Sequence, residues 1–191
     1  MREEECFECG CNLKSCCPGY EPTEGTKMTP EQEYESCYTR MNQICKEQSW
    51  GDPFSYARSR EIFTANKLGH SIATTFSGAD AFNKEGQPVE YKSTIGKNIK
   101  GSYTGISVQE NWDEQERYIR TEKIGKYVEH YYSRFDENGI AEIWSVPGHK
   151  VVDILLPKLK KKFPTILTKK DPRLSADVTL SEIQKYGTRV L

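Results

Sequence analysis

Apolar residues recur at helical spacing in the first half of the chain. The pair Thr29-Pro30 suits the start of a helix, and the pattern after it predicts a helix to about Gln48 with one buried face. Its apolar positions are Tyr34, Cys37, Tyr38, Met41, Ile44 and Cys45. A second helix is expected over 54–68, ended by Gly69. Its apolar positions are Tyr56, Ile62, Phe63, Ala65 and Leu68.

Strand and helix patterns alternate along the rest of the chain. Alternation of apolar and polar residues predicts a short strand at 70–76 and a hairpin that joins 126–134 to 141–146. A capping-box start at Asn111 predicts a helix to Ile124. The remaining predicted elements are a helix at 151–163, strands at 176–180 and 188–190, and a helical turn at 181–186. We therefore expect one main domain over residues 29–191.

The composition is polar, and the charge is unevenly distributed. No apolar run reaches the length of about 18 residues that a membrane helix needs. Residues 1–20 lack the apolar core of a signal peptide, so we expect a cytoplasmic, non-secreted protein with no membrane partner. The net charge is −1, but residues 1–50 carry 5 basic and 10 acidic residues, whereas residues 150–191 carry 10 basic and 4 acidic residues. Such polarised charge can form one basic face for a phosphate backbone.

All seven cysteines lie before residue 46, within or near an N-terminal segment over residues 1–28 that ends in a linker. Their odd number and the missing signal peptide argue against a disulfide framework. The candidate zinc ligands are Cys6, Cys9, Cys16, Cys17 and Cys37. The first two belong to a Cys-x-x-Cys-Gly run that resembles half of a zinc knuckle, and two of the other three would complete a structural Zn²⁺ site. The alternatives are reduced thiols in a flexible tail and a cluster prone to oxidation.

Residues 78–93 predict a β-hairpin. The strands are 80–83 and 87–93, and the three-residue loop between them ends in Gly86 because its last position requires a positive φ. In this register Asp80 faces Glu90, which places their Cβ atoms roughly 4.5–5.5 Å apart. Two carboxylates that close repel each other unless a cation lies between them.

The two-residue period of a strand adds Lys92 to the face of Asp80 and Glu90, and turns Val89 and Tyr91 to the other face. Two carboxylates and an ammonium on one face form the Asp…Glu-x-Lys set of metal-dependent phosphodiesterases. Mg²⁺ prefers oxygen ligands and keeps several waters, so two carboxylates and a substrate phosphate can hold it. Lys92 would orient the attacking water or neutralise developing charge. The alternative is a charged hairpin that faces solvent.

A longer motif surrounds these three residues. It reads Asp80-Ala81-x-Asn83-x-x-Gly86-Gln87-x-x-Glu90-x-Lys92-Ser93. This motif resembles, without a gap, the active-site hairpin of the PvuII-type restriction endonucleases in the PD-(D/E)xK nuclease superfamily. The likeness continues at Lys100-Gly101, at Thr104 and in the run Lys-Tyr-Gly-Thr-Arg at 185–189. It implies an α/β fold of the restriction-endonuclease type, with a mixed central sheet flanked by helices, here with a Cys-rich N-terminal appendage.

The resemblance also implies a function. It is that of a Mg²⁺-dependent type II restriction endonuclease, which hydrolyses phosphodiester bonds of double-stranded DNA at a short specific sequence. Asp80 and Glu90 would hold Mg²⁺ together with the backbone carbonyl of Tyr91, and Lys92 would assist the nucleophilic water. Glu61, in the helix before the hairpin, is a further candidate ligand or a solvated helix glutamate. A palindromic site implies a homodimer, and a cognate DNA methyltransferase is the expected genetic partner.

In that family the segment after the catalytic strand contacts bases. The candidate DNA-binding residues here are Lys97, Asn98, Lys100, Ser102, Thr104, Ser107, Gln109 and Asn111. Lysines neutralise phosphates, whereas amides and hydroxyls recognise base edges. The family's histidines after the conserved threonine are replaced by Gly105-Ile106-Ser107, so the recognition sequence need not be the same. The alternative is a polar hairpin without a partner.

Two other functions are compatible with these residues. One is a repair, resolvase or mobile-element nuclease on the same core, which would cut branched or damaged DNA instead of giving discrete plasmid fragments. The other is a non-catalytic, zinc-containing DNA-binding module, whose activity would not change on substitution of Lys92.

Overall fold

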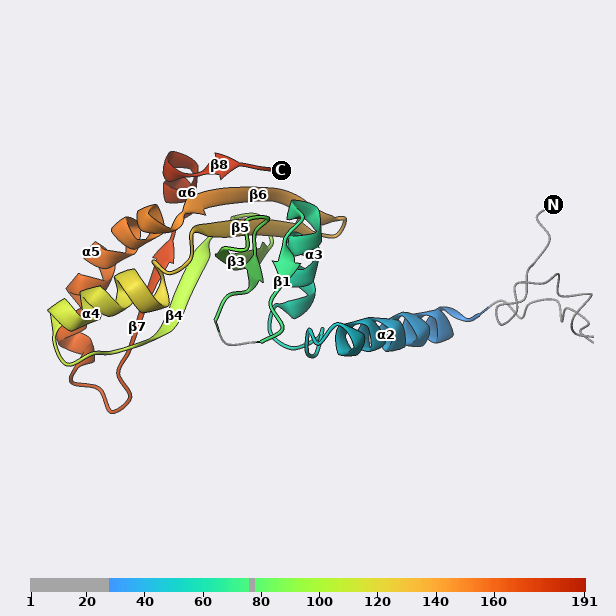
Figure 1. The fold of residues 1–191 in the computed structure, drawn as a ribbon, viewed down its shortest axis with the longest axis horizontal. Coiled ribbons are helices and arrows are strands. Elements are labelled where there is room, and N and C mark those ends of the chain that lie inside the picture. The colour runs from blue at the N-terminus through green and yellow to red at the C-terminus, as the bar shows by residue number, and fades with distance from the viewer. Residues whose placement is uncertain (1–27, 76–77) are drawn as a thin grey trace, which may run out of the picture. The chain divides into compact units, whose positions relative to one another are not determined.

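The computed structural model describes residues 28–75 and 78–191. The chain divides into two compact units, Met1–Arg40 and Met41–Leu191, and the division falls within helix α2 (Pro30–Glu47). The second unit contains the other described elements (Figure 1). Its helices are α3 (Arg58–Leu68), α4 (Trp112–Tyr118), the π-helical turn η1 (Ile119–Lys123), α5 (Gly148–Ile166) and α6 (Leu180–Tyr186). Its strands are β1 (Ser71–Ile72), β2 (Ala81–Phe82), β3 (Pro88–Ile95), β4 (Gly101–Ser107), β5 (Glu129–Asp136), β6 (Gly139–Pro147), β7 (Arg173–Val178) and β8 (Thr188–Arg189).

The strands form a mixed sheet and a smaller ribbon. In the described residues, six strands are ordered β1-β2-β3-β5-β6-β8, and β4 pairs with β7 in a separate two-stranded sheet. Strand β3 pairs with β5 in parallel, whereas the other neighbours in both sheets are antiparallel. The prediction of an α/β protein with a mixed sheet flanked by helices is therefore confirmed.

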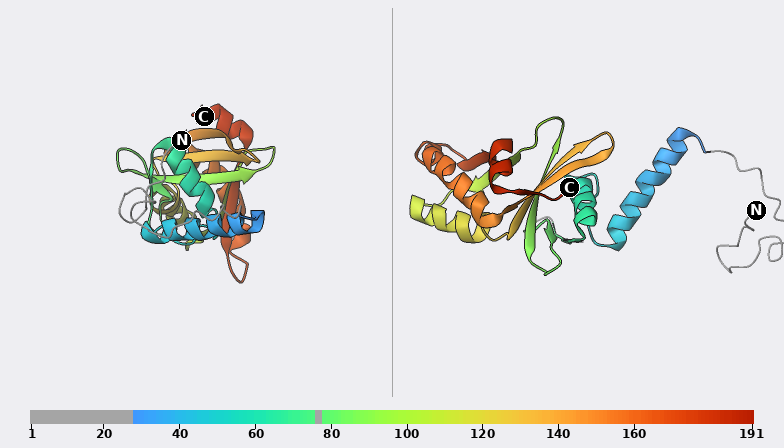
Figure 2. Two further views of the ribbon diagram at one scale, coloured as in Figure 1. Left: turned by 90° about the vertical axis from the view of Figure 1, so that its right-hand side faces the viewer. Right: turned by 90° about the horizontal axis from the view of Figure 1, so that it is seen from above.

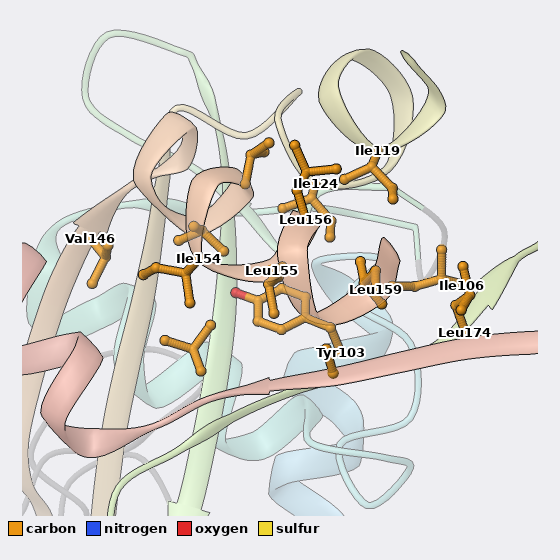
Figure 3. Packing of buried hydrophobic residues seen from close by; sticks show 14 of the residues in the cluster. Tyr103, Ile106, Ile119, Ile124, Val146, Ile154, Leu155, Leu156, Leu159 and Leu174 are labelled. Atoms are coloured by element: carbon orange, nitrogen blue, oxygen red, sulfur yellow. The ribbon is translucent and has the colours of Figure 1, made fainter. Parts of the chain in front are cut away.

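Helices cover both faces of the six-stranded sheet. In the right-hand view of Figure 2, α3 lies on one side of the strands and α4 and α5 lie on the other. On the α3 side, Ala65 joins Val89 and Tyr91 in a small buried cluster. On the other side a larger cluster joins residues of the sheet to α5 and to the β4–β7 ribbon, with Tyr103 packed near Leu155 (Figure 3). Because adjacent strands in register place paired side chains on one face, the polar side of β3 faces the larger cluster.

Several local predictions are confirmed. The β2–β3 hairpin pairs Phe82 with Pro88 as expected, and Gly86 has a φ of +76°. Asn111 caps α4, since its side-chain oxygen accepts a hydrogen bond from the Glu114 N–H at 3.0 Å. The hairpin predicted to join 126–134 to 141–146 is β5–β6, and the helix predicted at 151–163 is α5.

The second helix begins later than predicted. Helix α3 starts at Arg58 instead of residue 54, because the Asp52 side chain accepts the Phe54 N–H at 2.9 Å in a turn and Tyr56 has a φ of +53°, which no helix tolerates. Tyr56, one of the apolar positions of the predicted helix, lies before α3 and is 93% exposed. The strand predicted at 70–76 is also shorter: within the described residues 70–75 it spans Ser71–Ile72.

Helix α2 has the predicted bounds, but the prediction of a buried face is wrong. Tyr34, Tyr38 and Met41 are exposed, and Cys45 is the buried residue of this helix. Helical spacing shows which side chains share a face, but not whether another element covers that face. Within the described residues, none of the helices combines the length and apolar character that crossing a bilayer requires.

Candidate active site

The β2–β3 hairpin holds Asp80 against the strand that carries Glu90 and Lys92. The Tyr91 N–H donates to Asp80 Oδ2 at 2.7 Å, and the Asp80 N–H donates to the Val89 carbonyl at 3.2 Å. Both the backbone and the side chain of Asp80 are therefore tied to β3. The contact to Tyr91 involves its N–H, so a metal-ligand role for its carbonyl stays a prediction.

Glu90 and Lys92 form an ion pair on one face of β3. The Lys92 Nζ contacts Glu90 Oε1, and the two side chains are 23% and 15% exposed. Residues two apart on a strand point the same way, which makes this contact possible. The structure thus brings Glu90 and Lys92 together on the face that the sequence predicts, with Asp80 bound to the same strand.

Burial and charge shape the protonation of this set. Burial, together with the negative charges of Glu90 and Glu61, raises the pKa of Asp80 to about 7. Burial alone would lower the pKa of Lys92, but Glu90 and Asp80 outweigh burial, and the Lys92 pKa lies above its ordinary value. Lys92 is therefore an ammonium at neutral pH. The site contains more negative charge than one lysine can balance.

Three buried aromatic residues, Tyr103, His130 and Tyr132, form an aromatic floor beneath Lys92. The Lys92 Nζ is 5.2 Å from the centre of the Tyr103 ring, which is a cation–π distance. Tyr103 Oη is 2.8 Å from both His130 Nδ1 and Tyr132 Oη. His130 Nε2 lies 3.2 Å from the Ile124 carbonyl, which can only accept. We therefore assign the proton to Nε2, so that Tyr103 donates to His130 and Tyr132 donates to Tyr103.

This floor was not predicted from the sequence. Tyr132 and His130 lie opposite Lys92 and Glu90 through the parallel β3–β5 pairing, and Tyr103 comes from β4. Burial lowers the pKa of His130 to about 3, so its ring is neutral. A histidine two residues before a tyrosine on a predicted strand was the available signal, but it does not say which strand lies alongside.

Glu61 has a different environment from the hairpin carboxylates. Its Oε2 pairs with Arg58 Nη1 at 3.1 Å, and Arg58 is 1% exposed and also donates to the carbonyls of Trp50 and Ala73. Burial raises the pKa of Glu61, and Arg58 opposes that rise. The carboxylate holds a buried arginine in place, and its role as a metal ligand stays a prediction.

The hairpin residues fit a magnesium ion. In the described part of the chain, no three side chains of His, Cys, Asp or Glu gather into a metal-binding group. Mg²⁺ does not need such a group, because one or two carboxylates with water and phosphate oxygens suffice. Burial is the main cause of the raised pKa of Asp80, and a dication beside Asp80 and Glu90 would offset both burial and the neighbouring carboxylate charges that add to it.

The candidate DNA-binding residues lie on and around β4. Lys97, Asn98 and Lys100 are exposed before the strand, and Ser102 and Thr104 are exposed on it. The other three are partly engaged in the fold. The Ser107 carbonyl and the Gln109 N–H hydrogen-bond the side chain of Gln115, and the Asn111 side chain caps α4.

The predicted zinc site falls mostly outside the described residues. This applies to Cys6, Cys9, Cys16 and Cys17, whereas Cys37 is an exposed free cysteine on α2.

Neither models of known protein families nor the sequences of curated proteins match this chain.

Proposed function

We propose that this protein is a Mg²⁺-dependent endonuclease that hydrolyses phosphodiester bonds of double-stranded DNA at a short specific sequence, as a type II restriction enzyme does. The observation that carries the proposal is the Lys92 ammonium in contact with Glu90, on the strand to which Asp80 is bound. The resemblance of residues 80–93 to the PvuII-type hairpin supports the same chemistry. A sheet of the restriction-endonuclease type is part of the proposal.

Each residue of the site has a role in this reaction. Mg²⁺, when bound, would polarise the scissile phosphate and acidify a water. Asp80 and Glu90 would hold the ion, and the Tyr91 N–H fixes the orientation of Asp80. The Lys92 ammonium, placed by Glu90 and by the Tyr103 ring, would orient the attacking water and then stabilise the charge that develops on the phosphate oxygens.

Sequence recognition is assigned to β4 and the turn before it. Exposed Ser102 and Thr104 offer hydroxyls that can contact base edges, and exposed Lys97 and Lys100 offer charges for phosphates. These residues follow the β3 strand directly in sequence, so binding and cleavage would share one stretch of chain.

A palindromic target would require two copies of the site. The homodimer therefore belongs to the proposal, as does a cognate DNA methyltransferase that protects host DNA. Exposed Tyr34 and Met41 on α2 are compatible with a second copy. Sedimentation equilibrium of the full chain measures the oligomeric state directly, and a monomer at all concentrations contradicts the dimer.

Incubation with unmethylated supercoiled plasmid and Mg²⁺ tests the activity. We expect discrete fragments whose sequenced ends share one short motif, and no cleavage in the presence of EDTA. Lys92→Ala should keep DNA binding and lose cleavage. Lys84→Ala is the matched control, because Lys84 is an exposed lysine in the turn of the same hairpin, and this variant should cut like the wild type.

Cleavage restricted to branched or damaged DNA would indicate a repair or resolvase enzyme. DNA binding without cleavage in every variant would indicate a binding module.

A further inference from the structure

A positively charged groove lies away from the hairpin, between the C-terminal half of α5 and β7. Its volume is about 730 Å³. In Figure 1 the end of α5 leads through a loop into β7. The charged residues that line the groove are Lys158, Lys161, Lys162, Lys169, Arg173 and Asp177. Five cations from a helix, a loop and a strand thus converge on one hollow that contains a single carboxylate.

Two of these lysines are held in place by the edge of β7. Lys158 Nζ donates to the Asp177 carbonyl at 2.7 Å, and Lys162 Nζ donates to the Ser175 carbonyl at 2.6 Å. Among the strands that the structure describes, β7 pairs with β4 alone, so its other edge presents carbonyls that need donors. An ammonium has three donors, and one backbone bond leaves Lys162 able to bind an anion as well. Charges that are already positioned lose less side-chain entropy when they bind.

The groove has a surplus of positive charge. Glu182 Oε2 lies 2.7 Å from Lys158 Nζ, and Asp171 lies 3.2 Å from Arg173 Nε. In residues 28–75 and 78–191, no carboxylate lies within ion-pairing distance of the three other lysines, Lys161, Lys162 and Lys169. These three are exposed, so a ligand reaches them without unfolding the site.

We propose that this groove is a second phosphate-binding surface, which holds the backbone of the DNA duplex away from the bond that is cleaved. Four of the five cations are exposed, and the five are spread over a helix, a loop and a strand, which suits the spaced phosphates of a strand better than one enclosed phosphate. The β4–β7 register pairs Ser102 with Asp177. The groove therefore begins one strand away, roughly 5 Å, from a candidate base-contacting residue. The identity of the ligand rests on the proposed function, whereas the anion chemistry rests on the groove alone.

Salt dependence of DNA binding tests this surface. We would titrate a short mixed-sequence duplex in EDTA at several salt concentrations, with wild type, Lys161→Gln/Lys169→Gln, and the control Lys123→Gln/Lys185→Gln. The control removes the same charge from η1 and α6, outside the groove. Each phosphate contact contributes about 0.9 to the slope of log affinity against log salt, so the groove variant should lose up to about 1.8. The control should keep the wild-type slope, and thermal melting should show that all three proteins are folded.

Equal slopes in the groove variant and wild type overturn the proposal, as does an equal loss in the control, which would indicate net charge alone. Vesicles that contain an anionic phospholipid form a second arm. If the groove variant loses vesicle binding but keeps the wild-type salt slope for DNA, the groove binds a membrane surface, and the proposal that it binds a DNA duplex is rejected. Plasmid cleavage with Mg²⁺ is measured on the same proteins. If the wild type never cuts DNA but the groove variant has a smaller salt slope, the groove proposal stands and the nuclease proposal is rejected. If the wild type cuts DNA and all salt slopes are equal, the nuclease proposal stands and the groove proposal is rejected.

Discussion

The two faces of β3 contain different kinds of residue. Toward α3, Val89 and Tyr91 are 0% and 5% exposed and pack with Ala65. Toward the larger core, Glu90 and Lys92 form an ion pair near the Asp80 carboxylate, and the Lys92 ammonium lies over the buried ring of Tyr103. Buried apolar area stabilises the fold, whereas partly buried charges destabilise it unless each is paired. One strand therefore supplies stability on one face and chemistry on the other, because its two-residue period separates the two sets.

The largest expected effect is on the charged face. Lys92→Ala should lower cleavage by roughly three orders of magnitude, because the reaction loses the cation beside the scissile phosphate. Binding to a DNA duplex in EDTA should change little. Single-turnover cleavage and binding titrations measure the two quantities separately. Cleavage by Lys92→Ala at the rate of Lys84→Ala would remove the catalytic role of this face.

The opposite face should respond in stability instead. Val89→Ala removes two methyl groups from a fully buried position and should lower the free energy of unfolding by about 2 kcal/mol. The cleavage rate of the folded protein should stay near that of the wild type, because Val89 points away from Glu90 and Lys92. Denaturant unfolding and cleavage below the transition measure both. A large loss of rate in fully folded Val89→Ala would show that the two faces are not independent.

Asp80 connects stability to pH. Its folded pKa of about 7 lies above the unfolded value of about 3.9, so between these pH values the folded state holds a proton that the unfolded state has released. The stabilisation from the neutral acid is complete below about pH 4 and is lost as the pH rises through 7. Asp80→Asn stays neutral and can still accept the Tyr91 N–H.

Without divalent ions, Asp80→Asn should therefore be more stable than wild type above pH 7, by on the order of 1–2 kcal/mol, and the difference should shrink toward pH 4. Unfolding curves at several pH values in EDTA measure this difference. A stability difference between Asp80→Asn and wild type that does not change with pH would mean that the folded protein does not raise the pKa of Asp80.

The sequence was enough to predict the hairpin because the interactions that form it are local. Gly86 at the end of a short loop sets the register, and the register places Asp80, Glu90 and Lys92. The same reasoning identified the cap at Asn111, where donor and acceptor lie three residues apart.

Features that depend on distant segments could not be predicted in this way. The partner of β3 is β5, reached through a parallel crossover, so the residues around His130 do not show that it lies beside Glu90. The exposed Tyr34 of α2 has the spacing of a core residue, but spacing does not specify a covering element. Tyr56 differs for another reason, because the Asp52 turn and a positive φ override its helical pattern.

The smallest expected effect concerns the aromatic floor that the sequence did not reveal. Tyr103→Phe keeps the ring under Lys92 but removes the hydroxyl that donates to His130, which leaves a buried nitrogen without that donor. We expect a loss of about 1 kcal/mol in unfolding free energy and a cleavage rate within a few-fold of wild type.

Tyr132→Phe is the matched control, because it removes a hydroxyl from the same network without touching the ring that faces Lys92. If the floor acts on Lys92 through the ring alone, the two variants should cut equally well, since both retain that ring. A rate that falls only in Tyr103→Phe would instead show that the hydrogen bond to His130 sets the position of the ring, and through it the ammonium.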